Sequence, residues 1–207
     1  MGKRVVCQRC LKAQAACICA TIKSIDNQHF LHILQDPSEE KKAIGTARIL
    51  GLSLTAAKIT VGELFEASLF DLNNSYLLYP DESAMPVDSL LASGKINQKS
   101  QFILLDGSWK KAYKLLMINP FLQALPKISI NINKKSDYRI RKSPRVDGLS
   151  SVEAGYYLLS QLENNSEKFK PLLNSFSHMI NYQIASMPAE IYEHHYLAKE
   201  NLDKQKD

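Results

Sequence analysis

The sequence predicts an α/β fold, with a mainly parallel sheet covered by helices on both faces. Short apolar runs alternate along the chain with longer stretches of helical periodicity. The 207 residues are 45% hydrophobic and 23% charged, a composition that excludes disordered, collagen-like and fibrous proteins. No apolar run approaches the ~18 residues that span a bilayer, and no signal-peptide core follows Met1. We therefore expect a cytoplasmic protein without a membrane partner.

Five short apolar runs are expected to form the sheet, and turn or polar residues bound most of them. These runs span residues 30–34, 57–61, 76–79, 102–105 and 128–132. Helices are expected at residues 39–52, 86–93, 108–117, 150–162 and about 167–185. The periodicity of the third helix predicts one apolar face made of Trp109, Ala112, Tyr113, Leu116 and Met117. The fourth helix has a buried stripe made of Val152, Tyr156 and Leu159.

All four cysteines lie in the first 19 residues, with the spacing Cys7-x2-Cys10-x6-Cys17-x-Cys19. Four thiolates this close in sequence can surround one tetrahedral zinc ion at about 2.3 Å. Such a site is closed, so the predicted zinc ion is structural rather than catalytic. The alternative is a set of free buried or redox-active thiols. We predict two units, a zinc knuckle at residues 1–25 and an α/β domain at residues 26–207.

The net charge of +5 arises from 26 basic and 21 acidic residues, and basic residues gather in two segments. Residues 1–25 contain five basic residues and no acidic one. Residues 134–145 contain a single acidic residue and six basic ones, which are Lys134, Lys135, Arg139, Arg141, Lys142 and Arg145. Tyr138 lies among them and offers a ring for base stacking. Both segments favour contact with RNA phosphates, and a solvated basic surface is the alternative.

The turn after residues 102–105 has the composition of a ligand site, because open α/β sheets bind ligands at the carboxyl ends of their strands. Asp106 places a carboxylate at the mouth of the crevice, Gly107 permits a tight turn, and Ser108 is a natural N-cap. The alternative is that Asp106 only helps to cap the helix and that Trp109 is a core residue.

Two other turns are explained by helix capping alone. Ser38 is expected to cap the helix after the first strand, with Glu39 placed against the helix dipole. Ser150-x-x-Glu153 is a capping box. The sequence contains no Gly-x-Gly-x-x-Gly loop, Walker A loop or Gly-x-Ser-x-Gly elbow, so it does not support dinucleotide, P-loop or serine-hydrolase chemistry.

Taken together, these segments resemble the DTW-domain family of tRNA-uridine aminocarboxypropyltransferases over nearly the whole chain. The resemblance rests on the cysteine pattern and on six motifs in order: Gln35-Asp36-Pro37-Ser38-Glu39, Gly45-Thr46-Ala47-Arg48, Leu77-Leu78-Tyr79-Pro80, Asp106-Gly107-Ser108-Trp109, Tyr138-Arg139-Ile140-Arg141-Lys142 and Leu149-Ser150-Ser151-Val152-Glu153-Ala154. Ser108 and Ser151 stand where the family commonly has threonine, so the hydroxyl groups are kept. Asp36 replaces the family's usual histidine, and we assign that position no chemical role.

The resemblance implies both a fold and an activity. The fold is similar to that of SPOUT-type enzymes, whose cofactor lies in a knotted C-terminal part of an α/β sheet. The activity is transfer of the 3-amino-3-carboxypropyl group of S-adenosylmethionine to N3 of a tRNA uridine, at variable-loop position 47, with release of methylthioadenosine. The alternatives are an RNA methyltransferase of the same fold and a non-catalytic, zinc-stabilised RNA-binding protein.

The resemblance also implies residue roles. Asp106 is the catalytic candidate, because a carboxylate that accepts or orients the N3 proton would assist transfer. A carboxylate is a weak base, so it has to be desolvated or to act by orientation. The expected cofactor contacts are Tyr79, Pro80, Asp106, Gly107, Ser108, Trp109, Leu149, Ser150, Ser151 and Glu153. The basic loop at 134–145 and the zinc knuckle are expected to hold the tRNA phosphates.

Overall fold

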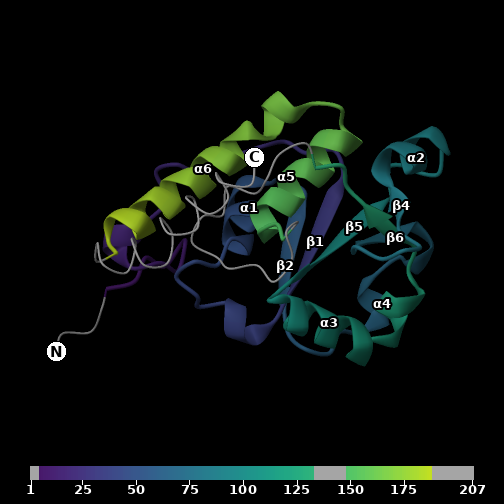
Figure 1. The fold of residues 1–207 in the computed structure, drawn as a ribbon, viewed down its shortest axis with the longest axis horizontal. Coiled ribbons are helices and arrows are strands. Elements are labelled where there is room, and N and C mark those ends of the chain that lie inside the picture. Colours follow the sequence, from purple (N-terminus) through teal and green to yellow (C-terminus); the bar gives the residue numbers. More distant parts are fainter. Residues whose placement is uncertain (1–4, 133–147, 188–207) are drawn as a thin grey trace, which may run out of the picture.

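The structure, a computed structural model, describes residues 5–132 and 148–187. Its centre is a six-stranded sheet in which all pairings are parallel, in the order β2-β1-β5-β3-β6-β4 (Figure 1). The strands are β1 (Phe30–Gln35), β2 (Ala57–Val61), β3 (Ser75–Leu78), β4 (Met85–Pro86), β5 (Gln101–Asp106) and β6 (Lys127–Ser129). The α/β prediction is confirmed. The two-residue edge strand β4 was not predicted, because it is too short to show a pattern.

The helices cover both faces of this sheet, as expected. The α-helices of the described residues are α1 (Ala47–Ser53), α2 (Val87–Ala92), α3 (Trp109–Ile118), α4 (Pro120–Ala124), α5 (Ser151–Leu162) and α6 (Ser166–Ala185). Short 3-10 helices are η1 (Gln14–Ala16), η2 (Pro37–Glu39), η3 (Ala67–Leu69) and η4 (Leu72–Asn74). The unpredicted α4 starts at a proline, which suits the first turn of a helix. Within the described ranges, no helix is both long enough and apolar enough to cross a membrane.

A hydrophobic core lies on each face, because successive side chains of a strand point to opposite sides. Phe102 and Leu104 of β5 belong to the first core, together with α1, α2, α5 and α6 (Figure 1). Ile103 and Leu105 belong to the second core, together with α3 and α4. The run at 102–105 is therefore apolar throughout because both of its faces are buried.

The helix predicted at residues 39–52 is divided in the structure into η2 and α1. Between these elements, the carbonyls of Ala43 and Gly45 accept hydrogen bonds from Nζ of Lys12, at 2.6 and 3.1 Å. In a continuous helix these carbonyls would bond to N–H groups of the next turn. A contact with a residue about 30 positions away therefore replaces the predicted first half of the helix.

The cysteine-containing segment lies against α1 and α6. Cys10 and Ile18 are buried in the first core, beside residues of the sheet and of α6. In α1, the guanidinium of Arg48 donates to the carbonyl of Arg9, from Nη2 at 2.6 Å and from Nε at 3.1 Å. The domain boundary after residue 25 stays a prediction, and these contacts connect the parts on its two sides.

Candidate functional site

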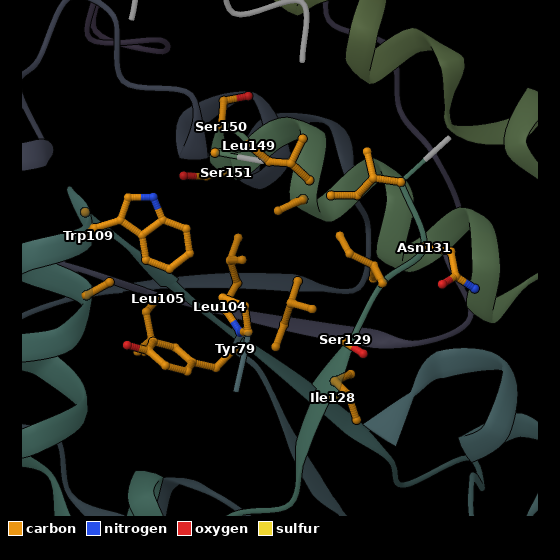
Figure 2. A pocket seen from close by; sticks show the side chains of 18 residues that line it. Tyr79, Leu104, Leu105, Trp109, Ile128, Ser129, Asn131, Leu149, Ser150 and Ser151 are labelled. Atoms are coloured by element: carbon orange, nitrogen blue, oxygen red, sulfur yellow. The ribbon is translucent and has the colours of Figure 1, made fainter. Parts of the chain in front are cut away.

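A cavity of about 450 Å³ lies at the carboxyl ends of β3, β5 and β6, beside the first turns of α3 and α5 (Figure 2). This is where open α/β sheets bind ligands, and the volume suits a small molecule. Mostly apolar residues line it: Leu78, Tyr79, Pro80, Leu104, Leu105, Gly107, Trp109, Ala112, Ile128, Ser129, Ile130, Asn131, Ile132, Gly148, Leu149, Ser150, Ser151 and Ala154. Figure 2 shows Tyr79 and Trp109 on one side of the cavity, with Ile128 and Ser129 across from them.

Seven of the ten residues expected to contact a cofactor line this cavity. They are Tyr79, Pro80, Gly107, Trp109, Leu149, Ser150 and Ser151. The parallel pairing of β3 with β5 brings the first two of these segments together, and α5 adds the third. Asp106, Ser108 and Glu153 are not among the lining residues. Contact of the ten residues with a cofactor stays a prediction.

Asp106, the predicted catalytic residue, ends β5 and has 6% of its surface exposed. Its two carboxylate oxygens accept hydrogen bonds from different elements. Oδ2 accepts from Nε2 of Gln35 at 2.7 Å, and Oδ1 accepts from the hydroxyl of Ser151. Gln35 ends β1 and Ser151 begins α5. One buried carboxylate therefore joins two strands and a helix beside the cavity.

Sequence reasoning did not assign Gln35 to this site. Gln35 and Asp106 are register partners of the adjacent strands β1 and β5, although 71 positions separate them. In the sequence, Gln35 and Asp106 each directly follow a predicted apolar strand, which places both at the carboxyl edge of the sheet. That signal was insufficient, because nothing local shows that these two strands are neighbours.

The predicted capping box is present at the start of α5. The hydroxyl of Ser150 accepts a hydrogen bond from the backbone N–H of Glu153 at 3.3 Å. In return, Oε2 of Glu153 accepts from the N–H of Ser150 at 2.8 Å and from its hydroxyl at 2.6 Å. Val152 and Leu159 of the predicted stripe are buried, and Tyr156 is partly buried against the same core.

The turn before α3 places Trp109 at the cavity. Ser108 is the N-cap residue, although within the described residues its side chain makes no capping hydrogen bond. Gly107 allows the first helical turn to come close, since a Cβ there would lie 2.9 Å from Cβ of Lys111. The indole of Trp109 meets the ring of Tyr79 edge-on, with 6.4 Å between the ring centroids.

The apolar face predicted for α3 is partly wrong. Ala112 and Leu116 are buried as expected, but Tyr113 and Met117 are 56% and 45% exposed. Leu115 is buried in their place. Apolar residues occur around most of this helix, so periodicity alone does not select one face. The buried face of α3 is the one that carries Ala112 and Leu116, because these residues pack against Ile103 and Leu105 in the second core.

The turn after β1 is capped by Asp36, and the expectation that Ser38 caps it is wrong. The carboxylate of Asp36 accepts hydrogen bonds from the N–H of Ser38 at 3.0 Å and from its hydroxyl. Nζ of Lys111 lies 3.8 Å from Asp36 and 2.9 Å from Oε1 of Glu39. Burial raises the pKa of the Asp36 carboxyl, but the Ser38 hydrogen bonds and the nearby lysine charge outweigh it, so the pKa is lowered.

The four cysteine sulfurs form a cluster. All Sγ atoms lie within 4.8 Å of one another, and the pairs Cys7–Cys19 and Cys10–Cys17 are each 3.7 Å apart. Sulfurs at the corners of a tetrahedron, about 2.3 Å from a central zinc ion, lie about 3.8 Å apart. The donor atoms and their spacing are therefore compatible with a metal site.

The thiols of this cluster differ in acidity. Hydrogen bonds from the backbone N–H groups of Cys10 and Arg9 lower the pKa of the Cys7 thiol to about 6. Burial and the neighbouring thiols raise the pKa of the Cys19 thiol to about 12. Thiolates this close repel one another, so simultaneous ionisation of all four requires a cation among them.

The six basic residues predicted to contact RNA lie outside the described residues. They are Lys134, Lys135, Arg139, Arg141, Lys142 and Arg145. Of the basic residues in the N-terminal segment, Arg9 and Lys23 are exposed, whereas Lys12 is 4% exposed and its ammonium binds backbone carbonyls. Of the three basic residues described in this segment, Lys12 is therefore not exposed to RNA phosphates.

Comparison with known proteins gives consistent matches. Residues 4–184 match the family model of the DTW domain. A protein named tRNA-uridine aminocarboxypropyltransferase 2 from Drosophila melanogaster is 27% identical over 214 residues, which cover 97% of this chain and 83% of that protein. Proteins of the same name from Macaca fascicularis and Mus musculus are 24% and 25% identical, over 88% of this chain and 64% of their own length. No solved structure matches the chain significantly.

Proposed function

This chain belongs to the DTW domain family, and on that premise we propose that it is a tRNA-uridine aminocarboxypropyltransferase. The proposed reaction moves the 3-amino-3-carboxypropyl group of S-adenosylmethionine to N3 of a uridine, at variable-loop position 47 of tRNA. The main supporting observation is that motif segments around Pro80, Gly107 and Ser150 meet at one cavity. The names of similar proteins from three animals support the coarser part of this proposal, aminocarboxypropyl transfer to a tRNA uridine.

The cavity fits the proposed donor in size and in chemistry. Its volume of about 450 Å³ lies within the range of small-molecule sites. The indole of Trp109 and the ring of Tyr79 offer apolar ring surfaces to an adenosine moiety. When bound, S-adenosylmethionine supplies carbons activated by a sulfonium. For this transfer the lining residues, Tyr79 and Trp109 among them, would have to orient the donor so that its aminocarboxypropyl group, rather than its methyl group, faces the uridine.

Asp106 is the catalytic carboxylate of this proposal. N3 of uridine has to lose a proton during transfer, and a neighbouring carboxylate accepts or orients that proton. Asp106 ends β5, and its hydrogen bond with Ser151 links the motif segments 106–109 and 149–154 beside the cavity, which supports this role. The resemblance to the family supports the same residue.

The cysteine cluster is proposed to hold a structural zinc ion, through Cys7, Cys10, Cys17 and Cys19. The compatible sulfur spacing supports this assignment. A cytoplasmic location is proposed with it, because reducing conditions keep thiols available as metal ligands. The basic residues at 134–145 and the exposed Arg9 and Lys23 are proposed to bind tRNA phosphates, supported by their charge.

A knotted C-terminal part, as in SPOUT-type enzymes, is also proposed. Leu78 at the end of β3 and Met85 in β4 both pair with Ile128 of β6, from its two sides. Residues 79–84 therefore cross β6 at its carboxyl end, and the chain beyond Ser129 has to pass this crossing. Such a crossing supports threading of the C-terminal part, which is rare in proteins. The residues at 133–147 that would complete the knot lie outside the described residues.

Nucleoside mass spectrometry tests the proposed function directly. Unmodified tRNA is incubated with the protein and with S-adenosylmethionine labelled either in the methyl carbon or in the aminocarboxypropyl carbons. The expected result is a modified uridine that carries only the aminocarboxypropyl label, with methylthioadenosine as the second product. Transfer of the methyl label instead would identify a methyltransferase of the same fold. Binding of tRNA without transfer of either label, and without donor binding in calorimetry, would identify a non-catalytic RNA-binding protein.

A further inference from the structure

Starting from the proposed function, we propose that Ser151 is a catalytic residue. Its hydroxyl accepts the N3 proton of the uridine while it passes its own proton to Asp106. Gln35 is a positioning residue that fixes the carboxylate of Asp106 for this purpose. In this arrangement Ser151 is the group that contacts the substrate, and Asp106 acts on the substrate through Ser151.

Ser151 is placed to touch a ligand, and Asp106 is not. Ser151 lines the cavity beside Leu149 and Ser150, at the start of α5 (Figure 2). Asp106 is buried and is not among the lining residues, and its Oδ1 accepts the hydrogen bond of the Ser151 hydroxyl. A substrate base in the cavity therefore meets the serine oxygen before it meets the carboxylate.

The hydroxyl of Ser151 is not consumed by helix capping. Ser150 and Glu153 form the complete capping box of α5, so Ser151 is not needed as a cap. A serine hydroxyl has one O–H to donate and two lone pairs to accept with. Donation to Asp106 uses the O–H, and the acceptor lone pairs of Ser151 remain available to a substrate N–H from the cavity.

Gln35 fixes the orientation of the Asp106 carboxylate. Nε2 of Gln35 donates to Oδ2 at 2.7 Å, and both residues are buried at one register position of β1 and β5. The two hydrogen bonds fix the carboxylate plane, so Oδ1 is directed to Ser151.

The proposed step balances in protons and electrons. The N3 electron pair forms the bond to the transferred carbon as the carbon–sulfur bond breaks, and that bond's electrons leave with the sulfur of methylthioadenosine. The N3 proton moves to Oγ of Ser151 while the former Ser151 proton moves to Oδ1 of Asp106. The imide N–H becomes more acidic as N3 gains its new bond, so a weak base suffices when both events are concerted. Asp106 later returns its proton to solvent through Ser151.

Single-turnover transfer assays across pH test this relay, with wild type, Ser151→Ala, Ser151→Thr, Asp106→Asn and the double variant. Ser160→Ala is the matched control, because Ser160 lies on the same helix, outside the cavity. We expect Ser151→Ala to lower the rate by roughly 10²- to 10⁴-fold, the usual contribution of general base catalysis. Ser151→Thr should restore most of the rate, and Ser160→Ala should keep it. Calorimetry should show unchanged donor affinity for Ser151→Ala, since its backbone is retained.

The pH profile separates catalysis from structural support. Without the relay, hydroxide has to remove the N3 proton, so the residual rate of Ser151→Ala should rise about tenfold per pH unit, more steeply than in wild type. The double variant should be no slower than the slower of the two single variants, because both residues act in one relay. A Ser151→Ala enzyme near the wild-type rate, or a slower one with the wild-type pH profile, overturns the relay alone. Wild-type protein that transfers neither label overturns the proposed function and the relay together.

Discussion

His32 of β1 shows how burial of one residue makes folding depend on pH. It is 2% exposed, its Nε2 lies 2.8 Å from Oγ1 of Thr60, and its ring packs 4.9 Å from that of Phe70. Burial and the charge of Lys58 lower the pKa of His32 from 6.5 to about 4. Between these values the unfolded chain binds the proton more tightly than the folded one, so stability falls as the pH falls. We expect a loss of roughly 3 kcal/mol between pH 7 and pH 4 from this residue.

Urea unfolding of wild type and of His32→Gln at both pH values measures this contribution. Glutamine can keep a hydrogen bond to Thr60 but does not titrate. The acidic residues titrate in both proteins, so their effect cancels in the difference. The stability advantage of wild type at pH 7 should shrink or reverse at pH 4. An advantage that stays constant between the two pH values would show that His32 does not titrate with the pKa stated here.

At the scale of elements, the crossing of α1 and α5 depends on a glycine. A Cβ at Gly155 would lie 2.6 Å from Cδ2 of Leu50, whose side chain is fully buried. Gly155→Ala favours the helix by about 1 kcal/mol, but overpacking against Leu50 costs about 1–3 kcal/mol. We expect a net loss of stability of up to about 2 kcal/mol, measured by urea unfolding.

A double-mutant cycle tests whether the loss arises at this contact. Leu50→Ala alone should cost about 2–5 kcal/mol, as expected for a buried leucine. In the Gly155→Ala background it should cost less, because the new methyl group fills part of the cavity. Leu122→Ala, in the second core on the other face of the sheet, should be additive with Gly155→Ala. Equal coupling of both leucines to Gly155 would contradict a local clash.

At the scale of the whole molecule, the cysteine cluster and the cavity are expected to unfold together. Cys10 and Ile18 share one core with α1, α5 and α6, and Ser175 of α6 donates a hydrogen bond to the carbonyl of Thr21. Removal of the proposed zinc ion should therefore destabilise the cavity as well. A loss of a few kcal/mol corresponds to roughly 5–15 °C in Tm for a chain of this size.

The single tryptophan makes this measurable, because Trp109 reports on the cavity and circular dichroism reports on all helices. After metal analysis of the reduced protein, thermal unfolding is followed by both signals with and without a chelator. Both midpoints should fall together, and added zinc should restore them. An unchanged Trp109 midpoint beside a lowered helical signal would show two independently unfolding units.

The sequence alone determined the features that depend on residues close together in the chain. Short apolar runs bounded by turn or polar residues located β1, β2, β3 and β5 to within a residue or two at each end. The capping box Ser150-x-x-Glu153 located the start of α5, because both of its hydrogen bonds span three residues. The spacing of the four cysteines indicated their cluster, since they lie within 13 residues of one another.

Only the tertiary structure decided which distant residues meet. Asp106 meets Gln35, 71 positions away, and Ser151, 45 positions away, because the strand order places β1 beside β5 and α5 at their carboxyl ends. The same packing buried Leu115 rather than Tyr113 on α3. Helix and strand patterns repeat over two to four residues, so they indicate which segments have a buried face. The partner of that face is set by the order of strands in the sheet, which no local pattern encodes.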